Sequence, residues 1–594
     1  MKKLISLLMI LAVVCGILLV FTACNDDEPT PPAESESESQ SEQPPVESDV
    51  ELKLMENKQF NYDIIRGEQI TEGCIALATE FYLYVNSLSE NDVSFSTDYN
   101  DDYLKTQTHD PERYEIIFGV SNYEQNAELV SNLGIGEFKV EVDGNKIFIV
   151  AFADEAMERA VTRLKTAIRE AYDEETGNIV INSAEIEGTM VADKELNTIP
   201  YLSELALETI YECGNGSKMI VQRNAKPEHF QQYLNKLNEK EFKKISESEA
   251  NKNLFATYES EHHILTVNYI EHKDRLTVTY DTRRTFSTPS YDDNWDESKK
   301  VCDAKLIQIG VTPIDNDAPN GESYLIRCED GSFIAFDGGF SGNEAGKTPR
   351  NNAKLIYDTL VKYNPDPSSK PRVAAWITTH FHADHYGALK TFLKTYAAKV
   401  DVESFIYNFP FPQYATYTEE AYTNLIQSFK TAYPKAEHIK AHTGQRFRFA
   451  NIEMEVLYTA ELLMSTNIEF FNDTSLVCRL YSNGQSIMMA GDMSPDANLI
   501  IRRMYVNYLK SDFYQVAHHG GRGGSEEFNK LCAPKWVLWP ISERVWDTYK
   551  AHSRNAWLSD KNSTVEIIFP AWFQTTVINL PFDGTESGYL VYQN

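Results

Sequence analysis

The chain has 594 residues, with 88 acidic and 55 basic side chains, so its formal net charge is −33. Hydrophobic residues make up 42%, a share typical of folded proteins, and the length predicts about three or four domains of roughly 100–200 residues each. The large negative charge argues against binding to nucleic acid or to an anionic membrane surface by bulk electrostatics, because both depend on Lys and Arg. We therefore expect no stable nucleic-acid complex.

The first residues have the features of an export signal. Lys2 and Lys3 precede an apolar run over residues 4–23, which ends at Thr22-Ala23-Cys24. The run is also long enough for an uncleaved membrane anchor. The small residues before Cys24, and the Asn and acidic residues after it, resemble the lipobox of bacterial lipoproteins. That resemblance implies that residues 1–24 are a signal peptide, that Cys24 is lipidated, and that a lipid anchor holds the protein at the extracellular face of the bacterial cell membrane.

An acidic segment follows the signal. Between Asp26 and Glu51 there are ten acidic residues and no basic one, together with Ser-Glu repeats and several prolines. Such a segment cannot bury enough apolar surface to offset the entropy lost on ordering, so residues 25–52 are predicted to be a disordered acidic Ser/Pro linker. The six cysteines beyond Cys24 are widely spaced and lack the close pairs of zinc ribbons. We expect structural thiols, although export would permit disulfides.

Residues 53–190 alternate strand and helix patterns and are predicted to form an α/β accessory domain. Asp143-Gly144 predicts a hairpin, and residues 155–172 have the apolar spacing of a helix. Three segments, Tyr62–Gly67, Glu115–Asn122 and the helix around Ala160-Val161, resemble the small α/β domain that precedes the barrel in family 20 glycoside hydrolases. This resemblance implies surroundings of cell wall or glycan, and the segments contain no catalytic motif.

Residues 200–290 are predicted to form a small α+β domain. A helix is expected over 227–237, and three short strands are expected over 255–258, 264–269 and 275–280. His262, His263 and His272 lie in the predicted hairpins without a metal-ligand pattern around them. We therefore expect these histidines to be exposed loop residues.

Residues 300–594 contain a cluster of potential metal ligands. An apolar run over 373–377 leads into Thr379-His380-Phe381-His382-Ala383-Asp384-His385, and two later runs lead into Asp492 and into His518-His519. Imidazole nitrogens and carboxylate oxygens suit zinc. Because each candidate follows an apolar run, we expect several strands to present these ligands at a common edge. A purely structural zinc site is the alternative, but such sites more often use closed Cys-rich sets.

This pattern resembles the HxHxDH signature of the metallo-β-lactamase superfamily, over roughly residues 305–594. The resemblance implies an α/β chain in which residues 300–594 form an αβ/βα sandwich, preceded by two small α+β accessory domains. It also implies that His380 and His382 bind a first ion and that Asp384, His385 and His518 bind a second. Asp492 would bridge the two ions. His519 is the alternative match for the final His. The implied cofactor is zinc, as one or two ions, with manganese left open.

One ligand of the superfamily is missing. Most members place a further His before the bridging Asp, whereas this chain has Phe471-Asn472-Asp473 in that stretch. Asn472 or Asp473 is predicted to take the position, which would give the first ion a weaker oxygen ligand or a water. The segments 472–477, 490–492 and 515–520 most resemble the soluble hydrolase domain of the DNA-uptake protein ComEC, and they are also similar to secreted phosphorylcholine esterases.

The resemblance implies a hydrolase in which two ions hold a hydroxide that attacks a phosphorus or carbonyl centre, because coordination lowers the pKa of water from 15.7 toward roughly 7. Asp384, His518 and His519 would be the catalytic residues. A β-lactamase is disfavoured because Asp492 stands where that type commonly carries Cys. We expect a phosphodiester or phosphoester substrate, either a small molecule or an envelope polymer. The alternatives are a non-catalytic surface or glycan-binding protein with a degenerate metal site, and an extracellular nuclease linked to DNA uptake.

Arg522 is the predicted phosphate contact. It lies in a Gly-rich turn directly after His518-His519, where the backbone can approach a bound group closely, and a guanidinium suits a phosphate. Nearby basic residues are expected to be solvated: Arg502, Arg503 and Lys510. Four further residues are predicted as walls of a pocket: Tyr407, Asn408, Trp539 and Asn555. The sequence does not indicate an oligomeric state.

Overall fold

The computed structural model describes residues 50–67, 70–98, 112–131, 133–214, 216–282, 295–311, 321–341, 351–410, 419–464, 468, 471–571 and 575–584. The predicted signal peptide, Cys24 and almost all of the acidic linker lie outside these residues. Within the described residues, no helix combines the length and the apolar character needed to cross a membrane. The six described cysteines are free thiols, and all but Cys302 are buried.

The region after the linker contains two sheets and the predicted helices. The four-stranded sheet has the order β2-β1-β9-β8, and the six-stranded sheet has the order β10-β6-β7-β5-β3-β4. The strands are β1 (Glu51–Glu56), β2 (Gln59–Phe60), β3 (Asp63–Arg66), β4 (Phe95–Thr97), β5 (Glu115–Phe118), β6 (Glu137–Asp143), β7 (Lys146–Ala151), β8 (Tyr172–Asp173), β9 (Asn178–Asn182) and β10 (Gly188–Val191). The helices include α2 (Glu72–Leu88) and α4 (Asp154–Ala171). Helix α4 forms because its apolar residues recur every three or four positions, and these residues are buried.

The second region is a six-stranded antiparallel sheet with the order β11-β12-β16-β15-β14-β13. Its elements are β11 (Leu207–Gly214), β12 (Ser217–Arg223), α6 (Pro227–Glu239), β13 (Lys243–Ala250), β14 (Asn253–Glu259), β15 (His263–Ile270) and β16 (Arg275–Thr282). The sequence predicted three of these strands. Strand β13 was missed because its sequence, KKISESEA, is largely charged and polar. Pairing with β14, rather than apolar patterning, holds it in the sheet.

His263 does not lie in an exposed loop, contrary to the prediction from the sequence. It opens β15 instead of lying in an exposed hairpin, and it is only 4% exposed. Its burial follows from pairing on both sides, since β15 lies between β14 and β16 and the His263 ring packs edge-on against Tyr280. His262 and His272 are exposed, as expected.

Residues 305–579 form two sheets that enclose one core. The first sheet has the order β23-β22-β20-β19-β18-β17-β31, with β21 also paired to β20, and the second has the order β24-β25-β26-β27-β28-β29-β30. Strands of the first sheet are β17 (Lys305–Gln308), β18 (Ser323–Arg327), β19 (Phe333–Asp337), β20 (Arg372–Thr378), β21 (Asp401–Val402), β22 (Ser404–Tyr407), β23 (Glu437–Lys440) and β31 (Thr576–Asn579). Strands of the second are β24 (Arg446–Phe449), β25 (Ile452–Tyr458), β26 (Val477–Ser482), β27 (Gln485–Met489), β28 (Phe513–Gln515), β29 (Trp536–Trp539) and β30 (Ile567–Pro570).

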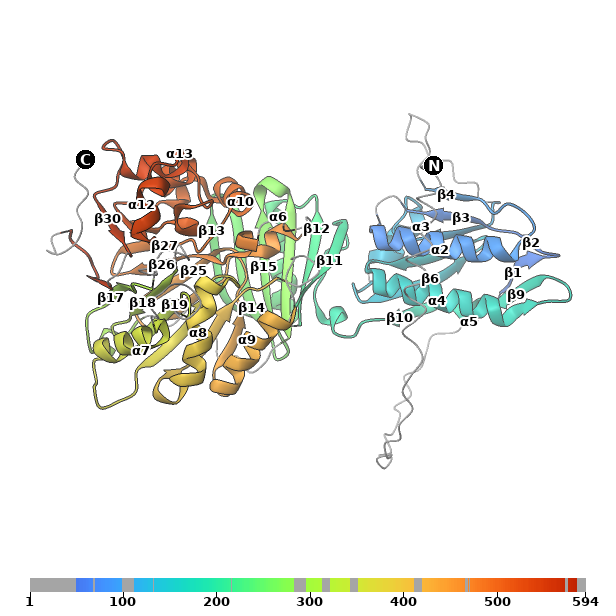
Figure 1. Ribbon diagram of the computed structural model, residues 1–594. Helices are drawn as coiled ribbons and strands as arrows, with labels where there is room; N and C mark the ends of the chain where they lie inside the picture. The colour runs from blue at the N-terminus through green and yellow to red at the C-terminus, as the bar shows by residue number, and fades with distance from the viewer. Residues whose placement is uncertain are drawn as a thin grey trace, which may run out of the picture. The chain divides into compact units, whose positions relative to one another are not determined.

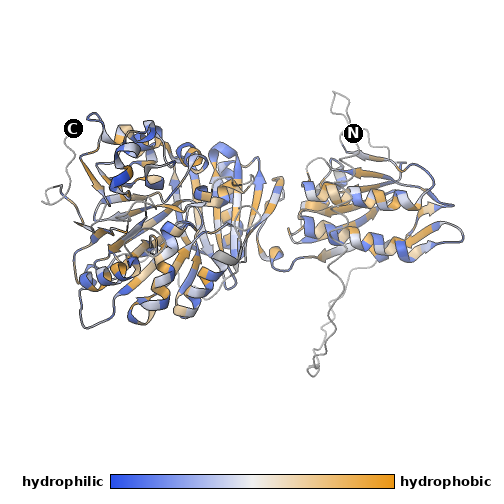
Figure 2. Ribbon diagram, viewed as in Figure 1, coloured by the Kyte–Doolittle hydropathy of each residue, from blue (hydrophilic) through white to orange (hydrophobic). Residues whose placement is uncertain are grey.

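Helices cover the outer face of each sheet. Helices α7 (Asn352–Tyr363), α8 (Ala383–Thr395) and α9 (Glu419–Ala432) share an apolar cluster with the first sheet. Helices α10 (Pro495–Tyr505), α11 (Glu526–Cys532) and α12 (Glu543–Lys550) share another with the second. Figure 1 shows the two groups of helices on opposite sides of the strands, and Figure 2 shows hydrophobic residues concentrated in the strands between them. These four layers are the αβ/βα sandwich predicted for this region.

The β11–β16 sheet contacts the sandwich through a buried ionic cluster. His442 Nδ1 lies 2.8 Å from Glu461 Oε2, and His442 Nε2 lies 2.8 Å from Asp281 Oδ2 on β16. Lys440 lies 3.8 Å from the same Glu461 and donates a hydrogen bond to the Cys213 carbonyl on β11. Burial would lower the pKa of His442, but the two carboxylates raise it to about 10. An imidazolium therefore joins the accessory sheet to the sandwich.

Candidate metal centre

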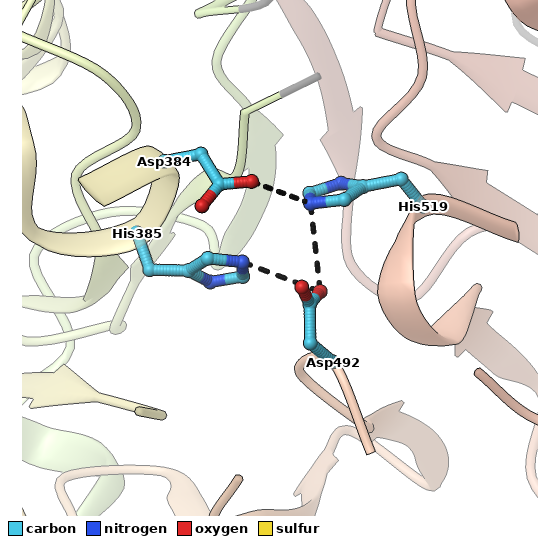
Figure 3. A group of neighbouring side chains, drawn as sticks. All are labelled: Asp384, His385, Asp492 and His519. Carbon is cyan, nitrogen blue, oxygen red and sulfur yellow. Dashed lines mark hydrogen bonds and ion pairs between the residues drawn. The ribbon is translucent and has the colours of Figure 1, made fainter. Parts of the chain in front are cut away.

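Four side chains from three separate segments converge at one end of the sandwich. Asp384 and His385 lie in the first turn of α8, Asp492 follows β27, and His519 follows β28. Each offers a ligand atom, and these atoms all lie within 4.8 Å of one another. His519 Nε2 lies 3.2 Å from Asp384 Oδ2, and His385 Nε2 lies 3.2 Å from Asp492 Oδ1 (Figure 3). We refer to these four residues as the His519 group.

A second set of ligand atoms shares Asp492. His380, His382 and Asp492 also lie within 4.8 Å of one another, and we refer to them as the His380 group. His380 Nε2 faces Asp492 Oδ2 at 3.8 Å, whereas His385 and His519 face Asp492 Oδ1 at 3.2 and 3.5 Å. The two oxygens of Asp492 therefore face two different groups, so Asp492 could contribute one ligand oxygen to a cation in each.

The residues present fit a bound cation. His380 Nε2, His385 Nε2 and Asp492 Oδ1 are buried and make no well-aligned hydrogen bond in the described part of the chain, although His385 Nε2 and Asp492 Oδ1 lie 3.2 Å apart. A buried polar group without a hydrogen bond lowers the stability of the fold by about 1–3 kcal/mol. Three such groups that face one another therefore indicate a binding site for a ligand. Nitrogen and carboxylate donors together suit zinc or manganese.

Surrounding groups orient the ligand rings. His385 Nδ1 lies 2.8 Å from Asp337 Oδ2, and His519 Nδ1 lies 2.8 Å from the Pro540 carbonyl oxygen. In both rings the Nδ1 proton is thereby held by an acceptor, which leaves Nε2 free to bind a cation. Sequence reasoning assigned no role to Asp337. Its signal was an acidic residue at a strand end immediately before Gly338-Gly339.

The electrostatics of the site depend on these contacts. Burial and neighbouring His385 lower the pKa of His380 well below 6.5, so this ring is neutral. Burial would raise the pKa of Asp492, but His519 and His385 hold it well below its usual range. Burial would lower the pKa of His519, but Asp492 and Asp384 raise it to about 9. At neutral pH the site thus combines an ionised Asp492 and a neutral His380, the forms that bind cations, with protonated His385 and His519, which would release a proton when a cation binds.

The structure places His519, not His518, with Asp384 and His385. Both histidines have left-handed backbone conformations, with φ of +50° and +54°. Their rings diverge, with centroids 6.2 Å apart. The His518 side chain stays 24% exposed, with Nε2 3.8 Å from Asp492 Oδ2 and 2.9 Å from Asn472 Nδ2. The structure therefore groups His519, in place of the expected His518, with Asp384 and His385, and the two histidine rings face different oxygens of Asp492.

Asn472 and Asp473 have different surroundings. Asp473 Oδ1 accepts hydrogen bonds from the backbone N–H groups of Ser494 and Ala497 at 3.0 and 2.9 Å, and so caps the start of α10. Burial raises the pKa of Asp473 to about 6. Asn472 instead contacts His518, and its Oδ1 is buried without a hydrogen-bond partner in the described part of the chain. Of the two candidates for the missing His, Asp473 is therefore engaged as a helix cap, whereas Asn472 lies beside His518.

The other predicted site residues divide into one exposed residue and four buried ones. Arg522 is exposed in the turn after His519. The four expected pocket walls are all buried, so they line no open surface: Tyr407, Asn408, Trp539 and Asn555. Trp539 Nε1 donates to the His519 carbonyl at 2.8 Å, and Asn555 Nδ2 donates to the Gly520 carbonyl at 2.7 Å. These two residues support the ligand loop from behind, while Asn408 donates to Glu461 at 3.0 Å.

One comparison with known proteins, the family model, agrees with this geometry. The family model described as "Metallo-beta-lactamase superfamily" matches residues 317–531. Curated proteins give no match. Among solved structures, the metallo-beta-lactamase fold protein YhfI from Bacillus subtilis is similar at 11% identity and a TM-score of 0.31, covering 47% of this chain and 100% of that one.

Two further solved structures are similar at a comparable level. One is a diiron beta-hydroxylase, CmlA, from Streptomyces venezuelae, with 12% identity and a TM-score of 0.27, covering 47% of this chain and 55% of that one. The other is a metallo-beta-lactamase from Cronobacter sakazakii, with 13% identity and a TM-score of 0.22, covering 33% of this chain and 73% of that one. At these scores the structural likenesses say nothing about the reaction. With the sandwich, the two ligand groups and the matching family model together, the C-terminal region of this chain is a metallo-beta-lactamase superfamily domain.

Proposed function

We propose that the chain is a metal-dependent hydrolase whose two ligand groups hold divalent cations, zinc or manganese. The observation that supports this most is Asp492, which directs one oxygen to the His380 group and the other to the His519 group. When bound, such cations supply an activated water and polarise a phosphoryl or carbonyl oxygen. No Ser or Cys nucleophile is required.

The protein's own groups would position the substrate. His518 and Asn472 lie on the partly exposed side of Asp492, where their ring and amide nitrogens can donate hydrogen bonds to a substrate oxygen. Asp384, with 23% of its side chain exposed, is the most accessible carboxylate of the His519 group. It is the group best placed to accept a proton from an attacking water, and His519 Nε2 at 3.2 Å keeps it ionised.

A phosphodiester or phosphoester is the proposed substrate class, either a small molecule or a polymer of the cell envelope. The exposed Arg522 supports it, since a guanidinium pairs with phosphate oxygens in a bidentate manner. The glycines around Arg522 let the turn lie against His518. A Cβ at Gly523 would come within 2.6 Å of His518 Cβ.

We also propose that the protein is exported and lipid-anchored through Cys24, with the accessory domains positioning the hydrolase or binding glycan. The lipobox-like sequence and the acidic linker support this part. Replacing Cys24 with Ala and following the protein between membrane and soluble fractions tests it. Retention of the variant in the membrane fraction would contradict a lipid anchor at Cys24.

The main alternative is a binding protein with a degenerate metal site, which the Asn at position 472 favours. Activity assays on the purified protein separate these possibilities. We expect the protein to cleave bis(p-nitrophenyl) phosphate and choline phosphate esters. Asp492→Ala should lose this activity, and the nearby exposed control Asp496→Ala should keep it. Turnover of single-stranded DNA alone would favour the nuclease, and no turnover with zinc or manganese would favour the binding protein.

A further inference from the structure

Gln515 makes an unusual set of contacts for the last residue of a strand. Its side chain is fully buried, and its Oε1 accepts a hydrogen bond from the Ala490 N–H at 2.7 Å. Its Nε2 donates to the carbonyls of Gly491 at 3.1 Å and Val516 at 2.9 Å. One amide therefore ties the segment before Asp492 to the segment before His519.

The same amide reaches across to the first sheet. Gln515 Nε2 donates to Glu322 Oε2 at 2.9 Å, and Glu322 lies immediately before β18. The Glu322 backbone N–H donates to the Asp384 carbonyl at 3.1 Å. Its carboxylate is 0% exposed and lies within 4.8 Å of ligand atoms on His385 and Asp337. Glu322 thus connects Gln515 to the third ligand-bearing segment.

We propose that Glu322 and Gln515 form a positioning pair that sets the spacing of Asp384, Asp492 and His519, and with it the cation affinity of the His519 group. The inference rests on the proposed function, because it assumes that this group binds a cation. Neither residue is itself placed as a ligand.

The physical reason is that the three ligand segments come from different places in the fold. Asp384 opens a helix beside the first sheet, whereas Asp492 and His519 follow strands of the second. Packing between apolar layers is nondirectional and does not set the position of a loop. Hydrogen bonds from one buried amide do, and partners outside the ligand set typically change metal affinity by about 10–100-fold when removed.

Gln308 offers a matched control. It is also a buried Gln that bridges the two sheets, since it lies on β17 and its Nε2 donates to the Phe569 carbonyl at 2.9 Å. Unlike those of Gln515, its side-chain hydrogen bonds within the described residues reach Phe569 and Tyr324, neither of which lies in a ligand-bearing segment. Both Gln515→Leu and Gln308→Leu should lower stability, the first by more because it removes four hydrogen bonds instead of two, but only Gln515→Leu should weaken cation binding.

The test is a zinc titration of the metal-free full-length protein against a chelating competitor. His382→Ala identifies the binding step of the His380 group. For Glu322→Leu and Gln515→Leu, we expect the affinity of the remaining step to fall by about 10–100-fold, with a smaller loss in the His380 step, which shares only Asp492 with the His519 group. Glu322→Gln keeps an acceptor oxygen and should restore near-normal affinity, and Gln308→Leu should leave both steps unchanged. Cobalt absorption spectra of the same variants report the geometry of the His519 group without any activity assay.

Several outcomes would overturn the inference. Unchanged zinc affinity in Gln515→Leu, or equal losses in both steps and in Gln308→Leu, would show that the pair has only a general structural role. If Gln515→Leu does not fold, the nearly isosteric Gln515→Glu, which places a second carboxyl against Glu322, takes its place with the same expected loss. Absence of zinc binding in the unmodified protein would instead refute the proposed function, and the inference with it.

Discussion

Removal of the His442 imidazolium should destabilise the contact between the β11–β16 sheet and the sandwich. His442→Gln removes the cation shared by the buried Glu461 and the half-buried Asp281, and leaves Glu461 with Lys440 at 3.8 Å. Breaking a buried ion pair by removing one partner costs about 3–5 kcal/mol. A pKa raised from 6.5 to about 10 corresponds to a similar amount, about 5 kcal/mol. We therefore expect a loss of about 3–5 kcal/mol at neutral pH.

The destabilisation caused by His442→Gln should depend on pH. Because folding raises the pKa of His442, its contribution is complete below about pH 6.5 and is lost as the pH rises toward 10. The difference in unfolding free energy between the unmodified protein and His442→Gln should thus shrink by about 1.4 kcal/mol for each pH unit in that window.

Urea unfolding at several pH values, followed by circular dichroism, measures this difference. His262→Gln, at an exposed position in the turn just before β15, is the matched control and should change little at any pH. A destabilisation by His442→Gln that stays constant between pH 6.5 and 10, or that is below about 1 kcal/mol at neutral pH, would refute the reasoning.

Three further predictions concern the site. His519→Ala should lose the cation of its group by plasma mass spectrometry, whereas His518→Ala should keep both cations and lose turnover; loss of a cation in His518→Ala would reverse the assignment. Arg522→Ala should raise KM for a phosphodiester several-fold with kcat nearly unchanged, and an unchanged KM would remove Arg522 from the substrate site. Asp473→Ala should lower stability by about 0.5–2 kcal/mol through the lost helix cap without changing zinc content; a fall in zinc content would show that Asp473 is a ligand.

The cluster from His380 to His385 could be predicted from sequence because its members lie within six positions after an apolar strand. Their proximity is local, so it needs no knowledge of the fold. Asp492 was predictable for a related reason, since it also follows an apolar run at a strand end. The sandwich followed from the same runs together with the resemblance of the motif.

The choice between His518 and His519 could not be made from sequence. It depends on two consecutive residues with left-handed backbone conformations, and the amino-acid sequence does not show which of the two rings turns toward Asp384. Glu322 and Gln515 were missed because a single polar residue at the edge of an apolar run looks like any strand end. Their role comes from contacts between residues far apart in the chain, such as the 2.9 Å hydrogen bond from Gln515 to Glu322.

Zinc content tests the central claim most directly. After exposure to zinc and removal of free metal, the purified protein should hold up to two ions per chain, because Asp492 faces two separate ligand groups. Asp492→Ala should lose most of this zinc, and Asp496→Ala should keep it. Clearly substoichiometric metal in the unmodified protein, with no binding of added zinc or manganese, would contradict the account.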